Sequence, residues 1–158
     1  MSKPKVRATI LDIPGKEKYK IIRAAVSRFN YAMEENFFLE ATALIESLIC
    51  DRLESRLGQL LKIPVNFNTI GELLKKLNKF ETDIELKNIM NKRLNNWCGQ
   101  RNITIHQAAK IELNKKKDWD VFLEEAERTA NEGRKIFDEY NKQLQKIRRT
   151  KVKRISKI

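Results

Sequence analysis

The sequence predicts an all-helical protein, an antiparallel bundle of four main helices with an extra N-terminal segment. Three observations favour this fold class. Helix-favouring residues (Leu, Glu, Lys, Arg, Ala and Gln) are common, whereas the 158 residues include five Gly and three Pro. Apolar residues recur every three or four positions over most of the chain. No internal repeat or linker divides the chain, so we expect residues 1–158 to form a single domain.

The first part of the chain combines an arm with a long helical pattern. Residues 6–10 alternate apolar and polar side chains before a Pro-Gly turn signal, so residues 1–15 are expected to form an extended arm. Neither Gly nor Pro interrupts residues 16–57, which fit one very long helix or two helices broken near residues 34–36. Their apolar stripe is Tyr19, Ile22, Val26, Phe29, Met33, Phe37, Ala41, Leu44 and Leu48.

Two further helices are expected in the middle of the chain. Thr69 and Glu72 have the spacing of a capping box, which predicts that a helix begins there. A second helix is expected from about Asp83 and is predicted to end near Gly99. The apolar residues of the first helix are Leu73, Leu74, Leu77 and Phe80, and those of the second are Leu86, Met90, Leu94 and Trp97.

The last predicted helix is capped by Asp118 or Asp120. Its apolar stripe is Trp119, Phe122, Ala126, Ala130, Gly133, Phe137, Tyr140, Leu144 and Ile147. Trp97 and Trp119 lie on apolar stripes, so we predict that both pack in the core instead of stacking on nucleic-acid bases. Residues 148–158 form a basic tail that either frays or extends this helix.

The net charge of +12 is concentrated at the two ends of the chain. Residues 1–23 hold seven basic and two acidic residues, and residues 142–158 hold eight basic residues and no acidic one. Basic ends attract polyanions such as nucleic acids by long-range electrostatics. A solubilising tail would have the same composition, so the charge leaves both interpretations open.

The composition also sets aside several classes of protein. No run of about 18 apolar residues could span a membrane, and the first residues lack the apolar core of a signal peptide, so we expect a cytoplasmic protein. Cys50 and Cys98 fit no metal-ligand spacing and are interpreted as reduced thiols on helix faces. With one histidine and no cysteine pair, we expect no metal site and no cofactor.

The segment from Arg101 to His106 is the strongest candidate for chemistry. If one helix ends at Gly99 and the next begins after Thr104, the guanidinium and the only imidazole of the chain lie close together at a helix junction. Histidine transfers protons near neutral pH, and arginine holds phosphate oxygens in its planar fork. Such a pair can cleave RNA without a metal, through attack of the ribose 2′-hydroxyl on the adjacent phosphate, and leaves DNA intact. Taken alone, the spacing favours a capping histidine and an ordinary surface arginine.

The motif Arg101-Asn102-Ile103-Thr104-Ile105-His106 resembles the Arg-x(4–6)-His signature of the HEPN superfamily (higher eukaryotes and prokaryotes nucleotide-binding). In that family a polar residue, often Asn, follows the arginine, and the motif falls between the third and fourth long helices. Residues 41–49 resemble the family's first-helix pattern, in which an acidic residue can lie near the catalytic arginine. Glu46 is the candidate for that role and Glu40 its competitor. The resemblance covers residues 28–147.

The resemblance implies a small helical domain that forms a homodimer and often acts as a metal-independent ribonuclease. Two Arg–His pairs then meet across a two-fold interface in one composite site. Such domains are common in prokaryotic toxin–antitoxin and antiviral defence systems, which implies an antitoxin or another defence protein as a partner. Some toxin members carry a Tyr two positions after the His, where this chain has Ala108, so regulation through that Tyr does not carry over. Other members lack activity and serve as binding modules.

We therefore predict a HEPN-type endoribonuclease that cleaves RNA to a 2′,3′-cyclic phosphate. Arg101 stabilises the charge on the phosphorane, His106 acts as general acid and base, and Asn102 supports the geometry. Glu46 orients Arg101 or merely stabilises the bundle as an ion pair. The alternatives are a non-catalytic module that binds nucleic acid or a protein through its basic ends, and a purely structural protein. The residues predicted to guide the RNA backbone, which would equally suit a solvated loop, are Lys110, Lys115, Lys116 and Lys117.

Overall fold

The computed structural model describes residues 15–65, 68–108 and 118–155, and all regular structure in these ranges is helical. The elements are α1 (Gly15–Glu34), α2 (Phe38–Leu61), α3 (Ile70–Phe80), α4 (Ile84–Asn88), η1 (Ile89–Leu94, a π-helix), α5 (Asn95–Gln107) and α6 (Trp119–Ile155). This confirms the all-helical prediction. The proposed arm over residues 1–14 and the end of the basic tail, residues 156–158, lie outside the described residues, whereas Gly15 and residues 148–155 are helical.

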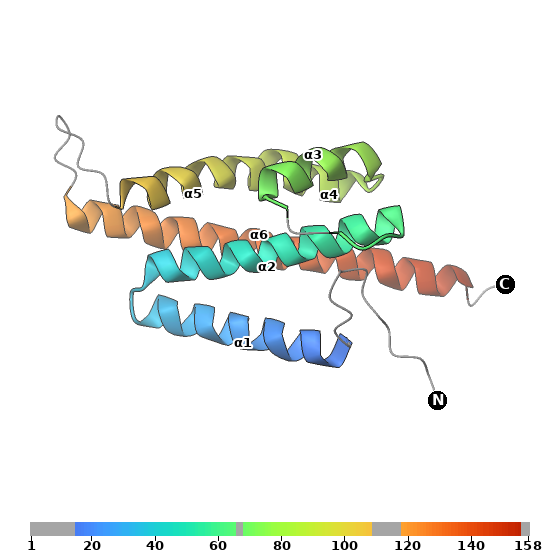
Figure 1. Cartoon of the computed structure of the whole chain (residues 1–158), viewed down its shortest axis with the longest axis horizontal. Coiled ribbons are helices and arrows are strands. Elements are labelled where there is room, and N and C mark those ends of the chain that lie inside the picture. The colour runs from blue at the N-terminus through green and yellow to red at the C-terminus, as the bar shows by residue number, and fades with distance from the viewer. Residues whose placement is uncertain (1–14, 66–67, 109–117, 156–158) are drawn as a thin grey trace.

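The long helices run to and fro along the long axis of the molecule (Figure 1). α1 runs in one direction, α2 returns, the α4–α5 segment repeats the first direction and α6 returns again. α2 and α6 therefore run parallel, and they form the main helix contact, while α1 and α3 pack on other sides of α2. None of the helices within the described ranges is both long and apolar enough to cross a membrane.

The helical pattern of residues 16–57 belongs to two helices, because the chain reverses at Asn36. Asn36 adopts a left-handed conformation with φ of 61°. The backbone N–H of Phe37 donates to the carbonyl of Ala32 at 2.7 Å, and that of Asn36 donates to Met33 at 3.3 Å. These two bonds form a Schellman motif, which satisfies carbonyls at the end of α1 and stops the helix.

The predicted helix starts in the middle of the chain are confirmed. The Thr69 hydroxyl accepts from the N–H of Glu72 at 3.3 Å, and the Glu72 carboxylate accepts from the N–H of Thr69 at 2.9 Å, which completes the capping box. Asp83 caps α4 by accepting from the N–H of Leu86 at 2.9 Å. Asp118 precedes α6 and accepts from the N–H of Asp120 at 3.4 Å, so Asp118 fits the cap better than Asp120.

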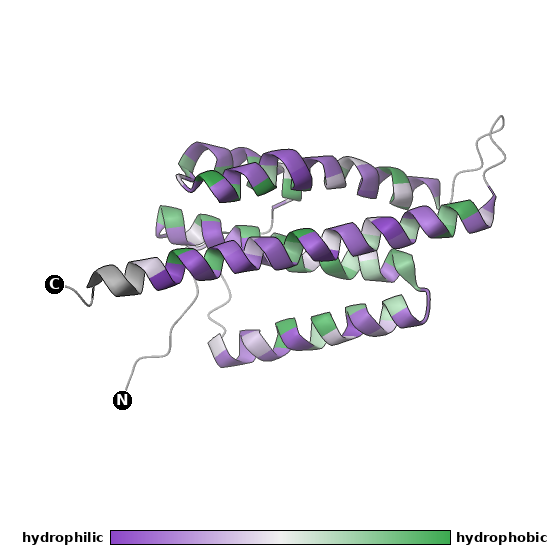
Figure 2. Cartoon of the chain, turned by 180° about the vertical axis from the view of Figure 1, so that it is seen from behind, coloured by the Kyte–Doolittle hydropathy of each residue, from purple (hydrophilic) through white to green (hydrophobic). Residues whose placement is uncertain are grey.

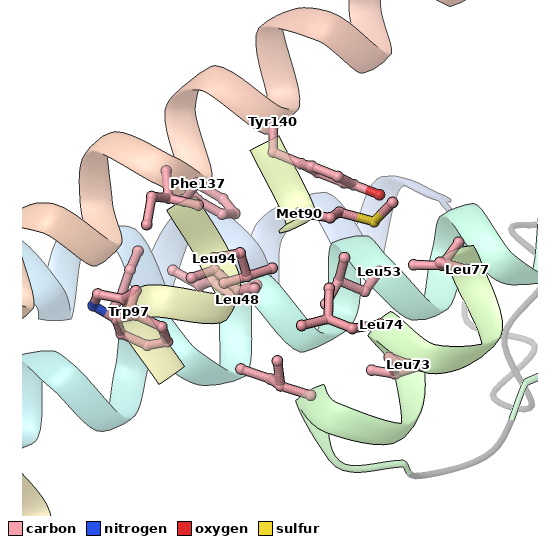
Figure 3. Close-up of a cluster of buried hydrophobic side chains, with 14 of the residues drawn as sticks. Leu48, Leu53, Leu73, Leu74, Leu77, Met90, Leu94, Trp97, Phe137 and Tyr140 are labelled. Carbon is pink, nitrogen blue, oxygen red and sulfur yellow. The ribbon is translucent and has the colours of Figure 1, made fainter. Parts of the chain in front are cut away.

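The core lies where α2, α3, the α4–α5 segment and α6 meet, and Figure 3 shows side chains from all four parts converging there. Seen from behind and coloured by hydropathy, the α5 and α6 ribbons are largely hydrophilic, as expected for helices that bury one stripe (Figure 2). Gly133 allows the closest approach, since a Cβ at this position would lie 2.8–2.9 Å from side-chain atoms of Trp97 and Ile45. Trp97, which is 1% exposed, is thus a core residue as predicted.

The core prediction for Trp119 is wrong. Its side chain is 58% exposed and stacks on Phe122 with ring centroids 5.0 Å apart. The reason is positional: α6 begins beyond the ends of the helices against which its stripe packs (Figure 1), so the first residue of that stripe has no core to enter. Phe80, at the last residue of α3, is also half exposed.

The prediction that a helix ends near Gly99 is also wrong, because residues 84–107 form one continuous helical segment through α4, η1 and α5. Among the described glycines none has the positive φ that a glycine helix stop uses. On either side of Gly99, Trp97 donates its indole N–H to the carbonyl of Thr129 at 2.8 Å, and the hydroxyl of Thr104 lies 3.1 Å from that of Thr129. These contacts tie α5 to α6 on both sides of Gly99 and favour an unbroken helix.

Candidate functional site

The Arg–His motif lies within α5 and not at a helix junction, which determines where its side chains point. A helix turns by about 100° per residue, so Arg101 and His106 are separated by roughly 140° around α5. Arg101 is half-buried on the side that faces α2, whereas Asn102 and His106 are exposed. The helix junction that was expected to bring the guanidinium and the imidazole together is therefore absent, because α5 runs unbroken from Asn95 to Gln107.

Arg101 forms an ion pair with Glu46 of α2. Its Nη2 lies 2.7 Å from Oε1 of Glu46, and the two side chains are 19% and 26% exposed. The Nε of Arg101 is buried and has no hydrogen-bond partner. The competing carboxylate, Glu40, instead accepts from Nε of Arg28 at 2.6 Å. The structure thus brings Glu46, and not Glu40, to the arginine of the motif.

Two thiols flank this ion pair. Cys50 of α2 and Cys98 of α5 are both free and half-buried, as predicted. Burial, with a smaller contribution from the carboxylates of Glu46 and Glu54 and against the opposing charge of Arg101, raises the pKa of Cys50 to about 12. Burial likewise raises the pKa of Cys98, and Arg101 again acts in the opposite direction. Both thiols therefore stay protonated at neutral pH, which makes them poor nucleophiles.

The outer face of α5 carries the remaining residues of the motif. Asn102 and His106 are four residues apart, so they lie on the same side of the helix. Ile103 and Ile105 beside them are 54% and 38% exposed. His106 has no hydrogen-bond or ion-pair partner among the described residues and lies in the last turn of α5.

A polar cleft of about 660 Å³ lies on the other flank of α5, between the η1–α5 segment and α6. Its charged lining residues are Lys92, Arg93, Arg128, Lys135 and Glu132, and the others are Asn96, Gln100, Asn131 and Trp97. Sequence reasoning missed this cleft. The available signal was the spacing of Arg128, Asn131 and Lys135 by three and four residues, which places them on one face of α6 next to its apolar stripe.

The site was also checked for metal ligands and for similarity to known proteins. Within the described ranges, no group of three or more His, Cys, Asp or Glu is placed to hold a metal ion. The predicted RNA-guiding lysines Lys110, Lys115, Lys116 and Lys117 lie outside the described residues. No protein-family model, curated protein or solved structure matches the chain.

Proposed function

We propose that this protein is a HEPN-type endoribonuclease that needs no metal ion. The observation that carries the proposal is the Arg101–Glu46 ion pair. In the family that the motif resembles, an acidic residue can lie near the catalytic arginine, and Glu46 lies there in this chain. Arg101 uses Nη2 in this pair and its side chain stays 19% exposed, so the rest of the guanidinium edge can donate to a phosphate. In this proposal the helical bundle has four main helices, which are α1, α2, the α4–α5 segment and α6.

The proposed reaction is an internal transesterification of RNA. His106 takes the proton of a ribose 2′-hydroxyl, whose oxygen forms a bond to the adjacent phosphorus. The bond from phosphorus to the 5′-oxygen breaks, and the protonated His106 returns its proton to that oxygen, which leaves as a 5′-hydroxyl. Arg101 stabilises the negative charge of the phosphorane, Glu46 positions Arg101, and Asn102 contacts the phosphate or the imidazole. The other product is a 2′,3′-cyclic phosphate.

The positions of Arg101 and His106 on α5 make the proposal depend on a second chain. Because the two side chains lie about 140° apart around the helix, Arg101 of one chain is proposed to act with His106 of the other. The exposed Ile103 and Ile105 beside His106 supply apolar area for a two-fold contact through the outer face of α5. The proposed active form is therefore a homodimer.

The direct test is cleavage of labelled single-stranded RNA in excess EDTA, with DNA of the same sequence as the substrate control. We expect the wild-type chain to cut RNA to cyclic-phosphate ends and to leave DNA intact. His106→Ala should lower the rate by about 10²–10⁴-fold, the usual contribution of a general acid or base. Asn95→Ala, which alters another exposed residue of α5, should leave the rate unchanged. Equal cutting by wild type and His106→Ala would reject the proposal.

The second candidate is a non-catalytic helical module that binds nucleic acid. It is favoured by the cationic cleft and by the lack of a partner for His106 within the described part of the chain. This candidate predicts salt-dependent RNA binding without cleavage by the wild-type chain. In either case we propose that the protein acts in a prokaryotic toxin or antiviral system and has an antitoxin or another defence protein as its partner. Growth arrest of a bacterial host by the wild-type chain, but not by His106→Ala, would support the catalytic form.

A further inference from the structure

We propose that the cleft between the η1–α5 segment and α6 binds the phosphate backbone of single-stranded RNA. The choice of RNA as the ligand rests on the proposed function, while the cleft itself rests on its own charge and shape. No residue of the Arg–His motif lines it. It is therefore a binding site separate from the proposed chemistry.

Three basic side chains that line the cleft have no neutralising partner among the described residues. Arg93 is satisfied internally, because it pairs with Glu132 at 2.5 Å and also with Glu139. Lys92 and two basic residues of α6, Arg128 and Lys135, have no ion-pair or hydrogen-bond partner among the described residues. Three like charges facing one cleft repel each other, and a bound polyanion relieves that repulsion. Phosphate groups are thus the ligands that this lining favours.

The shape and the uncharged lining decide how such a ligand would be held. About 660 Å³ lies within the range of roughly 300–1,000 Å³ for ligand sites, but the lining is far more polar than that of a typical small-molecule pocket. The floor residue Trp97 is 1% exposed and already donates its indole N–H to Thr129, so it offers no ring face to a base. Asn96, Gln100 and Asn131 add amide donors and acceptors. The cleft therefore binds through phosphates and amide contacts, without base stacking.

The cleft also lies suitably for delivery to the motif. Gln100 lines the cleft and directly precedes Arg101, which lies on the opposite flank of the same helix. The charged residues on the α6 side follow one face of that helix from Arg128 to Lys135. A strand held along this face would extend from the cleft toward the last turns of α5, where the motif lies.

The test measures binding of a short fluorescein-labelled 2′-O-methyl RNA by anisotropy, at salt concentrations of about 50–200 mM. This probe lacks the 2′-hydroxyl, so cleavage cannot interfere. Lys92→Gln combined with Lys135→Gln should weaken binding about three- to tenfold. Each lost phosphate contact on a single strand removes about 0.7 from the slope of log K against log salt, so the double variant should lower the slope by about 1.4. Lys75→Gln with Lys79→Gln is the matched control, because these exposed lysines of α3 line no part of the cleft.

A second variant tests the same cleft in the opposite direction. Glu132→Gln removes the one carboxylate that lines the cleft within the described ranges and leaves Arg93 paired with Glu139. We expect tighter RNA binding, a gain that misfolding cannot imitate.

The outcomes separate this proposal from the proposed ribonuclease. Equal affinities and slopes for the cleft variant and its α3 control would overturn the cleft assignment, even if the wild-type chain cleaves RNA. Preferential binding of poly-glutamate over RNA would also overturn it, in favour of an acidic protein ligand. A lower slope for the cleft variant alone, together with tighter binding by Glu132→Gln, would establish the cleft even if no RNA is cut.

Discussion

Two of the arginine–glutamate ion pairs that involve α2, Arg56–Glu81 and Arg101–Glu46, lie in very different surroundings. Arg56 of α2 binds Glu81, just after α3, through both Nε and Nη2, at 2.7 and 2.8 Å. These side chains are 6% and 0% exposed, and the carboxylate also accepts the N–H groups of Thr82 and Asp83 at 3.0 Å. Arg101 binds Glu46 by one contact, and both side chains are partly exposed.

The difference indicates which pair is structural and which is available for a ligand. In the Arg56–Glu81 pair the carboxylate uses four hydrogen bonds, so the pair has little capacity for anything else. In the Arg101–Glu46 pair the guanidinium keeps a buried Nε without a partner. The Arg101 side chain is 19% exposed against 6% for Arg56, so a phosphate can reach part of the Arg101 guanidinium and not that of Arg56. The comparison therefore supports a binding role for Arg101 and a folding role for Arg56.

The largest expected effect is on the buried pair. Glu81→Gln leaves the charge of Arg56 buried without its counter-ion, so we expect the free energy of unfolding to fall by about 3–5 kcal/mol. Urea denaturation followed by circular dichroism measures this change. Replacing both partners, Arg56→Met with Glu81→Leu, should recover much of the loss because no buried charge remains. A loss below about 1 kcal/mol for Glu81→Gln would remove the distinction between the two pairs.

The pH dependence of stability should also report on the Arg56–Glu81 pair. Burial tends to raise the pKa of Glu81, but the hydrogen bonds from Arg56 and from the N–H groups of Asp83 and Thr82 outweigh it, and the net pKa lies below the ordinary 4.5. A carboxylate with a lowered pKa stabilises the fold above its unfolded pKa, and this stability is lost as the pH falls through the folded pKa. The stability difference between wild type and Glu81→Gln should therefore shrink as the pH falls below about 4.5. A difference that stays constant down to acid unfolding would contradict this assignment.

Gly99 of α5 and Gly133 of α6 should respond in opposite directions to replacement by alanine. At Gly133→Ala the new Cβ would lie 2.8–2.9 Å from Trp97 and Ile45, so overpacking should cost about 1–3 kcal/mol. At Gly99→Ala the new Cβ meets nothing within 4 Å, and inside a helix alanine is more stable than glycine by about 0.5–1 kcal/mol. Thermal unfolding of the two variants checks both signs. Destabilisation by Gly99→Ala would indicate that α5 is broken there and that Arg101 is placed differently.

The smallest expected effect on stability belongs to the pair at the motif. Glu46→Gln removes a partly exposed ion pair with one contact, so we expect the free energy of unfolding to change by only about 0.2–1 kcal/mol. The denaturation experiment used for Glu81→Gln measures it under the same conditions. A loss as large as that for Glu81→Gln would show that Arg101 and Glu46 form a structural pair.

Much of the fold could be predicted because it depends on neighbours in sequence. The capping box at Thr69 and the apolar stripes of α2 and α6 are local patterns, and they predicted the helices that the structure contains. The break at Asn36 stayed open because the Schellman hydrogen bonds that fix it are formed by ordinary backbone groups. The predicted helix end at Gly99 is wrong because a glycine can occupy a helix interior as well as a helix end. The contacts with Thr129 that favour a continuous α5 join residues 25 and 32 positions apart, so local sequence does not show them.

In the candidate site, too, some features could be predicted from the sequence, and features that depend on long-range packing could not. The pairing of Arg101 with Glu46 was expected from the resemblance to a family motif, and the structure brings the two side chains together. The expected helix junction between Arg101 and His106 is wrong, because α5 continues to Gln107. The Arg56–Glu81 pair was missed because its members are 25 residues apart and neither has a distinctive sequence context. The cleft was missed because it forms only when η1, α5 and α6 come together.

Arg101 of one chain is proposed to act with His106 of another. The most direct measurement is RNA cleavage in excess EDTA by Arg101→Ala and His106→Ala chains, each alone and then co-expressed and co-purified through different tags. If the site is shared, each variant alone is inactive, and cleavage returns in mixed dimers, which make up about half of a randomly assorted population. If the mixture remains as inactive as either variant while the wild-type chain cleaves RNA, the two residues do not act across an interface and the account is contradicted.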